Sequence, residues 1–325
     1  TAEAIRNAWS RTTRTILIDS RLCLVSMNDS VKPCLEGPVS QRTVMRVVVV
    51  MPARNEEALI SQSIASIPEI VDWIVVVDDG STDKTCQFSQ RALDSRGEVV
   101  STQGLGVGGA IEIGCKKALT RFGQNCVIVV MAGDGQMDPR DLETVIQPVL
   151  DGRSDHVKGN RWLHPDGPKG MPVVRQVGTW WLSRLTSLAS GVRIRDSQCG
   201  YTATSGSMIA DWDWSRTWQG YGYPNWWLME AGRRGFRIEE VPVRSIYANE
   251  KSGIKISRFL GSVSWMLWKG IWRRGIDWYI LGKDTNPFLR VVATSLWFGG
   301  WFALLFSLQQ PALLVAAPVA FMILA

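Results

Sequence analysis

The sequence predicts an α/β domain with a mainly parallel sheet, followed by interfacial helices and a transmembrane hairpin. Short runs of β-branched residues alternate with helical patterns, which is typical of parallel strands flanked by helices. Polar residues follow the end of each run, where such sheets bind ligands, and the chain ends in long uncharged stretches. The predicted segments are an N-terminal extension (1–43), a globular domain (44–250), interfacial helices (251–287) and membrane-spanning residues (288–325).

Each predicted strand is a short apolar run, and each predicted helix has apolar residues at helical spacing. The run VMRVVVVM at residues 44–51 is typical of a strand buried on both faces, and Pro52 closes it. In chain order we expect a strand at 44–51, a helix at 56–67, a strand at 73–77, a short strand starting at 99–100, a helix at 110–122 and a strand at 127–131.

The C-terminal segment predicts membrane insertion. Residues 291–308 contain no charge, Gln309, Gln310 and Pro311 follow, and uncharged residues continue to Ala325. This pattern indicates a transmembrane helix, a turn and a second helix. A buried hairpin in a soluble core is the alternative.

The net charge of +6 is concentrated before this segment. Residues 244–290 hold nine Lys or Arg against three acids, interleaved with Trp265, Trp268, Trp272 and Trp278. Basic and tryptophan-rich sequence beside an apolar span favours a membrane interface, and the positive-inside rule places the globular domain in the cytoplasm. Nucleic acid is not an expected partner, because that interpretation needs the basic stretch without the apolar tail.

Cysteine and histidine usage argues against zinc sites and disulfide frameworks. The six cysteines show no CxxC spacing, and the chain has only two histidines. Residues 1–43 contain no continuous apolar stretch of the signal-peptide kind. We expect them to form a variable or partly disordered extension.

Asp134 and Gln136 form the first candidate site, in a glycine-rich turn directly after the strand at 127–131. A hard cation such as Mg²⁺ or Mn²⁺ takes few protein oxygens and several from a diphosphate, so these two side chains predict a metal site. A turn acid that caps the helix near Pro139 is the alternative, but Asp138 suits that position better.

Two further features follow strands. Asp78 and Asp79 could accept hydrogen bonds from a ribose or a base, or they could serve the turn while residues 81–83 cap the next helix. Residues 104–109 read GLGVGG and match GxGxxG, which raises a dinucleotide-binding interpretation. That match is weak, because no acid occurs about twenty residues later to bind the ribose.

As an ordered set, these motifs resemble those of family 2 glycosyltransferases, and most closely the branch that acts on dolichol phosphate and polyprenyl phosphate. The resemblance covers roughly residues 44 to 260 and is highly specific. Its motifs are MPARNEE at 51–57, VDDGSTD at 77–83, GLGVGGA at 104–110, DGQMDP at 134–139, GNR at 159–161, DSQCGY at 196–201, Glu230, and EVPV at 240–243.

The resemblance implies a GT-A fold that binds a nucleotide sugar and a divalent metal. It places metal ligands at Asp134 and Gln136, and the nucleotide at Pro52, Ala53, Arg54, Asn55, Glu56, Asp78, Asp79, Gly106 and Gly133. Three positions depart from the family pattern. Ala132 replaces the usual first Asp of DxD, Gly104 replaces an Asn, and Arg54 replaces a Tyr or similar residue. Metal binding is therefore expected to be weaker or to rest on Asp134 alone, and base preference is expected to differ.

The expected acceptor is a polyprenyl phosphate. A phosphate monoester has a second pKa of about 6, so it is already an anionic nucleophile at pH 7, and no strong general base is needed. Its binding calls for cations. The resemblance assigns these to Arg161, Arg175, Lys255 and Arg258, with surface charge or lipid-headgroup contact as alternatives.

The remaining candidate catalytic residues surround the sugar. We expect Asp196 and Gln198 near the transferred sugar and Glu230 at its hydroxyls, while Asp196 could equally be an internal cap or an arginine partner. Together with Asp134, Arg161 and Arg175, these residues make up the predicted catalytic set.

The predicted activity is therefore inverting transfer of a hexose from a GDP- or UDP-linked donor to a dolichyl or undecaprenyl phosphate. Alternatives are a membrane scaffold of the same fold with weakened catalysis, and a transferase with a saccharide acceptor. A processive polysaccharide synthase is disfavoured because QxxRW is missing. A nicotinamide oxidoreductase is the remaining rival, and the oligomeric state, including a homo-oligomer, stays open.

Overall fold

The computed structural model describes residues 13–18, 21–26, 45–246, 256–277, 287–288, 291–292, 294–296 and 298–299. The chain divides into two compact units, residues 1–43 and 44–325. In the first unit, β1 (Thr13–Ile18) pairs antiparallel with β2 (Arg21–Ser26). The sequence analysis did not predict this hairpin.

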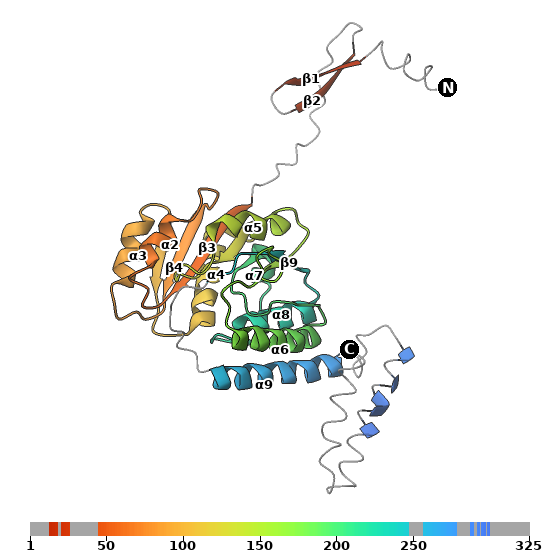
Figure 1. Ribbon diagram of the computed structural model, residues 1–325. Coiled ribbons are helices and arrows are strands. Elements are labelled where there is room, and N and C mark those ends of the chain that lie inside the picture. Colours follow the sequence, from red (N-terminus) through yellow and green to blue (C-terminus); the bar gives the residue numbers. More distant parts are fainter. Residues whose placement is uncertain are drawn as a thin grey trace. The chain divides into compact units, whose positions relative to one another are not determined.

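The second unit alternates strands and helices, as the sequence predicted (Figure 1). Its first half contains β3 (Arg46–Ala53), α2 (Ile60–Ala65), β4 (Trp73–Asp78), α3 (Thr85–Leu93), β5 (Gly97–Ser101), α4 (Val107–Phe122) and β6 (Cys126–Val130). Its second half contains η1 (Pro139–Asp141), α5 (Leu142–Leu150), β7 (His156–Asn160), α6 (Val173–Ser190), β8 (Thr202–Ser205), α7 (Gly206–Ala210), η2 (Trp214–Arg216), α8 (Tyr223–Arg234), β9 (Ile238–Pro242) and α9 (Ile256–Gly275).

The second unit contains a seven-stranded sheet in the order β5-β4-β3-β6-β8-β7-β9. Strands β5, β4, β3 and β6 run parallel to one another, and β7 runs parallel to β9. Only β8 runs against the strands beside it. The mainly parallel sheet that the sequence predicted is confirmed.

The valine run of β3 is buried on both faces of the sheet, which explains why it is continuous rather than alternating. Val47, Val49 and Met51 belong to a core that includes residues of α2 and α5. Val48 and Val50 belong to the opposite core, with residues of α4 and α8. Each fully buried valine contributes roughly 1.5 kcal/mol or more to stability.

A further helical layer is formed by α6, α8 and α9. Leu182, Leu185 and Ala189 of α6 pack with Met229 of α8 and with apolar residues of α9 in a separate apolar cluster. Figure 1 shows α9 as the outermost of these helices. No helix among the described residues is both long enough and apolar enough to cross a membrane. The predicted transmembrane hairpin at 288–325 lies largely outside the described residues.

Candidate active site at the carboxyl edge of the sheet

The sheet topology brings most of the predicted site residues to one edge. Because β3, β4, β5, β6 and β7 run in the same direction, the segments that follow them leave the sheet at the same edge. Because β8 is antiparallel to β6 and β7, the segment that precedes β8 lies at that edge as well. The predicted residues gathered there are Pro52 to Glu56, Asp78, Asp79, Gly106, Gly133, Asp134, Gln136, Arg161, Asp196 and Gln198.

The segment after β3 is fixed to the segment after β4 by hydrogen bonds. Asn55 has a left-handed φ of 57°, a conformation that asparagine tolerates. Its backbone N–H donates to Ser81 Oγ at 3.0 Å, and its side-chain oxygen accepts the Thr82 N–H at 2.8 Å. The Glu56 N–H donates to Thr85 Oγ1 at 2.7 Å. The loop predicted to contact the nucleotide is therefore rigidly positioned.

Asp78 and Asp79 are both buried, with 5% and 4% of their surface exposed. Asp78 accepts hydrogen bonds from the backbone N–H and the hydroxyl of Ser81, so it closes the turn after β4. Asp79 accepts the hydroxyl hydrogen of Thr102 at 2.6 Å. The structure thus shows the turn role that the sequence left open, and nucleotide contact by the pair stays a prediction.

Three backbone N–H groups of the glycine loop are already hydrogen-bonded within the protein. Asp79 accepts the N–H groups of Leu105 and Gly106 at 2.7 and 2.8 Å, and the Gln219 carbonyl accepts that of Gly108 at 2.7 Å. A Cβ at Gly106 would lie 2.6 Å from the same carbonyl oxygen, which explains the glycine. A dinucleotide-binding loop needs such N–H groups for the pyrophosphate. This geometry argues against the oxidoreductase interpretation.

Asp134 lies in the turn after β6 and is partly exposed. Its Oδ1 accepts the Gln136 N–H at 3.0 Å, and Gly135 between them has a φ of 70°. Asp138 caps the next helical turn by accepting the Arg140 N–H at 2.9 Å, as the sequence predicted. The side-chain hydrogen bond from Arg140 holds the pKa of Asp138 below its usual range. Asp134 is therefore not needed as the helix cap.

The chemistry of Asp134 and Gln136 suits a hard divalent cation. Within the described part of the chain, no group of three or more His, Cys, Asp or Glu residues could hold a metal ion. A cation here would take one carboxylate and one amide oxygen from the protein and its other ligands from phosphate and water, as Mg²⁺ commonly does. The residues present thus fit a metal that binds together with the donor diphosphate.

Asp196 is fully buried, and both of its carboxylate oxygens accept hydrogen bonds from the protein. Arg161 donates to it through Nε at 2.8 Å, through a second guanidinium nitrogen at 2.9 Å and through its backbone N–H at 3.1 Å. The N–H groups of Gln198 and Cys199 also donate to it. Burial alone raises the pKa of Asp196, but Arg161 outweighs it, with help from Lys158, and the pKa is lowered. The structure shows the arginine partner that the sequence considered as an alternative.

Glu240 of β9 fixes the backbone of the same segment. Its carboxylate accepts the N–H groups of Arg195 at 3.0 Å and Asp196 at 2.9 Å. Burial raises the pKa of Glu240. Glu240 belongs to a motif of the family resemblance, but only the tertiary structure identifies it as the residue that holds the chain around Asp196.

Gln198 joins this segment to the helical layer. Its amide nitrogen donates to Asn225 of α8 at 2.7 Å. The amide nitrogen of Asn225, which is fully buried, donates to Thr186 of α6 at 2.8 Å and to Ser197 at 3.0 Å. A shift of α6 or α8 would therefore displace the side chain of Gln198.

Strand β7 carries buried polar residues that the sequence analysis missed. His156, Lys158 and Asn160 lie on one face and are 1%, 0% and 0% exposed. Lys158 donates to the Cys199 carbonyl, and burial lowers its pKa. Alternating polar residues normally indicate an exposed strand face, so the sequence signal pointed away from a buried role.

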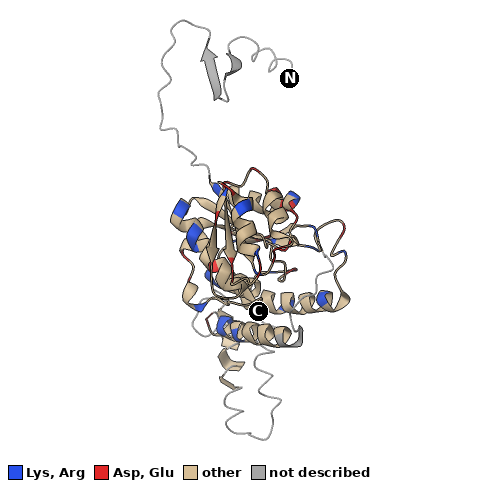
Figure 2. Ribbon diagram, turned by 90° about the vertical axis from the view of Figure 1, so that its left-hand side faces the viewer, with Lys and Arg blue, Asp and Glu red and all other residues tan. Residues whose placement is uncertain are grey.

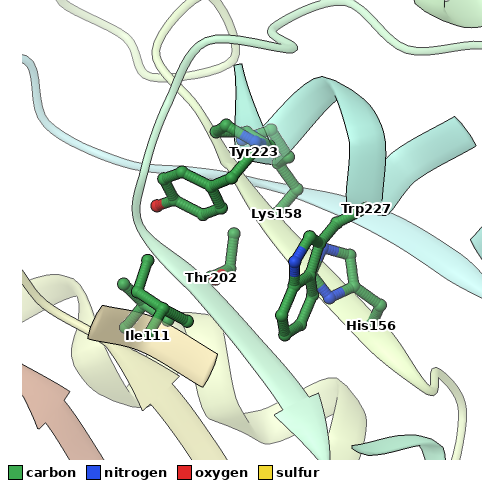
Figure 3. Close-up of a pocket in the computed structure, with 8 residues that line it drawn as sticks. Ile111, His156, Lys158, Thr202, Tyr223 and Trp227 are labelled. Carbon is green, nitrogen blue, oxygen red and sulfur yellow. The ribbon is translucent and has the colours of Figure 1, made fainter. Parts of the chain in front are cut away.

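His156 and Lys158 line a small cavity beneath α8 (Figure 3). Its volume is about 10 Å³, which is room for about one water molecule. His156 Nδ1 lies 2.8 Å from Thr204 Oγ1. The other residues that line the cavity are Ile111, Val130, Thr202, Tyr223, Pro224 and Trp227.

We expect His156 to make the folded state less stable in acid. Burial lowers its pKa to about 3, with a second contribution from Lys158, against about 6.5 when unfolded. Its stabilising contribution is therefore complete above pH 6.5 and is lost as the pH falls towards 3. Between pH 7.5 and 5.5 the free energy of unfolding should fall by about 1.4 kcal/mol on this account.

Urea unfolding of the purified chain at these two pH values checks this expectation. Because glutamine does not titrate, the free energy of unfolding of His156→Gln should fall by about 1.4 kcal/mol less than that of the wild type over the same pH range. Equal losses in both proteins would contradict a buried neutral His156.

The structure does not bring Glu230 to the carboxyl edge. Glu230 lies in the last turns of α8, is 5% exposed, and pairs with Arg233 at 2.7 Å and with Arg273 of α9 at 3.6 Å. Contact of Glu230 with the sugar hydroxyls stays a prediction.

Three of the predicted acceptor cations come from later segments. Arg175 lies in the first turn of α6 and Arg258 in the first turn of α9, whereas Lys255 lies outside the described residues.

The chain resembles known proteins over this region. Residues 48–209 match the family model described as Glycosyl transferase family 2. An uncharacterized protein of Methanocaldococcus jannaschii is 34% identical over 208 residues, which cover 62% of this chain and 82% of that protein. The UDP-N-acetylglucosamine–dolichyl-phosphate N-acetylglucosaminyltransferase of Methanococcus voltae is 31% identical over 217 residues, which cover 62% of this chain and 86% of that enzyme.

A solved structure supports the fold. Glucosyl-3-phosphoglycerate synthase of Mycobacterium tuberculosis, in complex with Mn²⁺, uridine diphosphate and phosphoglyceric acid, superposes with a TM-score of 0.52. The match is 21% identical and covers 71% of this chain and 78% of that one. The GT-A type of α/β fold implied by the sequence resemblance is confirmed for the globular domain.

Proposed function

Because the chain belongs to glycosyl transferase family 2 and is a hexosyltransferase, we propose that it transfers a hexose from a nucleotide diphosphate sugar to a polyprenyl phosphate with inversion. The observation that carries the proposal is the single edge of the sheet at which the ends of β3, β4, β6 and β7 and the start of β8 meet. The relative from Methanococcus voltae, which is named for a dolichyl-phosphate acceptor, supports the choice of acceptor.

The two halves of this edge suit the two substrates. The loop at 54–56 and the acids Asp78 and Asp79 line the side that would take the nucleoside. Arg161, after β7, and the segment at 196–198 line the side that would take the acceptor phosphate. Asp134, after β6, stands between them in the strand order, where the donor diphosphate would lie.

The proposed reaction is a single displacement. A phosphate oxygen of the acceptor bonds to the anomeric carbon, and the bond from that carbon to the diphosphate oxygen breaks, releasing the nucleoside diphosphate. Since the acceptor phosphate is anionic at pH 7, the protein need not remove a proton. Its task is to hold two anionic groups together, and Arg161 and Arg175 supply positive charge for this.

A divalent metal fits this chemistry. Bound at Asp134 and Gln136, Mg²⁺ or Mn²⁺ would neutralise charge on the diphosphate leaving group. The neighbour from Mycobacterium tuberculosis, which was solved with Mn²⁺ and uridine diphosphate, supports the inclusion of a metal.

We also place the protein at a membrane with its globular domain in the cytoplasm. The uncharged sequence at 291–308 and the basic, tryptophan-rich sequence before it support this location. Nucleotide sugars are available on that side.

A lipid-labelling assay tests the proposed activity. Membranes containing the full chain are incubated with a polyprenyl phosphate, Mg²⁺ or Mn²⁺, and radiolabelled GDP- or UDP-linked hexoses. Label should enter the organic extract with at least one donor. If every donor leaves the extract unlabelled while a soluble saccharide becomes labelled, the acceptor assignment is wrong.

Arg175→Ala should raise the KM for polyprenyl phosphate by about tenfold or more while changing the KM for the nucleotide sugar little. A lost charge-assisted hydrogen bond is worth about 1.5–3 kcal/mol, which corresponds to this change. Arg91→Ala, which removes an exposed arginine from α3, serves as the matched control. The reverse pattern of KM values would reassign Arg175 to the donor.

A further inference from the structure

Helix α6 presents an apolar stripe to the outside of the protein. The exposed fractions are 72% for Val173, 62% for Val174, 60% for Val177, 57% for Trp180 and 49% for Trp181. Their spacing of i, i+1, i+4, i+7 and i+8 places them on one face of the helix. In a globular protein such a stripe normally faces the core, and an exposed one marks a binding surface.

The stripe is exposed although α6 is firmly packed. Leu182 and Leu185 of α6 belong to the apolar cluster shared with α8 and α9, and Thr186 accepts the buried hydrogen bond from Asn225. The opposite face of α6 is therefore already used in the core. The stripe is therefore a second apolar face of the same helix, and its residues are about half exposed or more.

Helix α9 extends this surface, because it runs beside α6 in the same direction. A Cβ at Gly178 would lie 3.6 Å from Leu260, and a Cβ at Gly270 would lie 3.4 Å from Ala189. Between these contacts the Trp181 indole N–H donates to Ser264 at 3.2 Å. The next residue of α9, Trp265, is 61% exposed.

The charge pattern of this surface favours an anionic partner. Neither α6 nor α9 contains an acidic residue, and Figure 2 shows no red along either helix. Arg184 lies 5.7 Å from the centre of the Trp180 ring, and Lys269 lies 5.8 Å from that of Trp265. Tryptophan with exposed basic side chains and apolar residues is the combination that binds the headgroup region of anionic bilayers.

We propose that the α6 stripe, together with Trp265, is a docking surface for an anionic lipid bilayer. This inference rests on the membrane location proposed above and extends it from the C-terminal sequence to a helix of the globular domain. Arg175 lies in the first turn of α6, two residues after Val173, and therefore on a different face of the helix from the stripe. The hydrogen bonds from Gln198 to Asn225 and from Asn225 to Thr186 would connect the docked helix to the carboxyl edge.

Quenching of tryptophan fluorescence tests this surface independently of catalysis. The full chain is reconstituted into vesicles of phosphatidylglycerol and phosphatidylcholine with brominated acyl chains. The variant Trp180→Phe/Trp265→Phe should lose a measurable part of the quenched emission. Trp73→Phe, which removes a half-buried indole that stacks with Arg121 in the globular domain, should leave the amount of quenched emission unchanged.

The possible outcomes separate the docking surface from the activity. If Trp180→Phe/Trp265→Phe retains all of the quenched emission, bilayer docking is wrong. If this variant instead shifts the protein to a smaller assembly in detergent, with unchanged quenching, the stripe binds a second copy of the chain and the proposal is overturned. If quenching is lost as expected but no lipid becomes labelled in the transfer assay, bilayer docking by the stripe is supported and the proposed function is wrong.

Discussion

Replacing Asp134 by alanine should lower glycosyl transfer at least about a hundredfold while the fold is retained. Loss of one group that stabilises transition-state charge commonly costs a factor of about 10² to 10³. In the proposed site, Asp134 would supply the carboxylate for the metal and the diphosphate, and Ala132 offers no second one. The substitution removes the hydrogen bond from the Gln136 N–H to Asp134, but Asp138 keeps the cap of the following helical turn, so the fold should be retained.

Two measurements separate the metal role from a general loss of structure. Electron paramagnetic resonance of Mn²⁺ in the presence of nucleoside diphosphate should show weaker binding to Asp134→Ala than to the wild type. Asp151→Ala, which removes a partly exposed acid after α5, is the matched control and should keep both activity and Mn²⁺ binding. Near-normal turnover or unchanged Mn²⁺ binding in Asp134→Ala would remove this residue from the metal site.

Asp196→Ala should destabilise the protein by about 3–5 kcal/mol, because it removes the carboxylate that pairs with a largely buried guanidinium. The Arg161 side chain is only 15% exposed, and two of its nitrogens donate to Asp196. The N–H groups of Gln198 and Cys199 would lose their acceptor as well. The change in the free energy of unfolding is measured by urea denaturation.

A surface ion pair provides the contrast for this measurement. Glu239 pairs with Arg153 at 2.9 Å, but their side chains are 36% and 54% exposed, so Glu239→Ala should cost at most about 1 kcal/mol. If Asp196→Ala does not fold, the milder Asp196→Asn is compared with Glu239→Ala instead. Equal losses for the residue 196 and residue 239 variants would show that the buried pair is not a principal stabilising contact.

Asp196→Asn also distinguishes positioning from contact with the sugar. If Asp196 acts only by holding Arg161, the variant should mainly raise the KM for the acceptor phosphate. A fall in kcat at saturating concentrations of both substrates, with stability kept, would support the sequence-based placement of Asp196 beside the sugar.

The sequence predicted the first half of the fold well because its strands are continuous β-branched runs. The strand at 44–51 was found as β3, and that at 127–131 as β6, each shifted by one or two residues. The helix at 56–67 is shorter in the structure and spans Ile60–Ala65. Asn55 has a left-handed φ, and the Glu56 N–H donates to Thr85, so the residues before Ile60 form a loop fixed to α3 instead of the first turn of the helix.

The second half of the sheet was not foreseen, and the reason is physical. Strand β7 reads HVKGN, and its buried residues His156 and Lys158 have partners on β8 and on the loop that precedes β8. Sequence periodicity records only polarity, so a polar face with distant partners inside the protein looks the same as a face in water.

The sequence by itself determined the positions of the acids and arginines after the strands and their likeness to one glycosyltransferase family, because these depend on residue type and order. Only the tertiary structure decided which hydrogen bonds these groups form within the protein. Asp79 holds the glycine loop, Asp196 holds Arg161, and Asp134, which is partly exposed, accepts the Gln136 N–H within its own turn. Leu105 and Arg161 lie 26 and 35 residues from Asp79 and Asp196, so the order of residues along the chain does not reveal these hydrogen bonds.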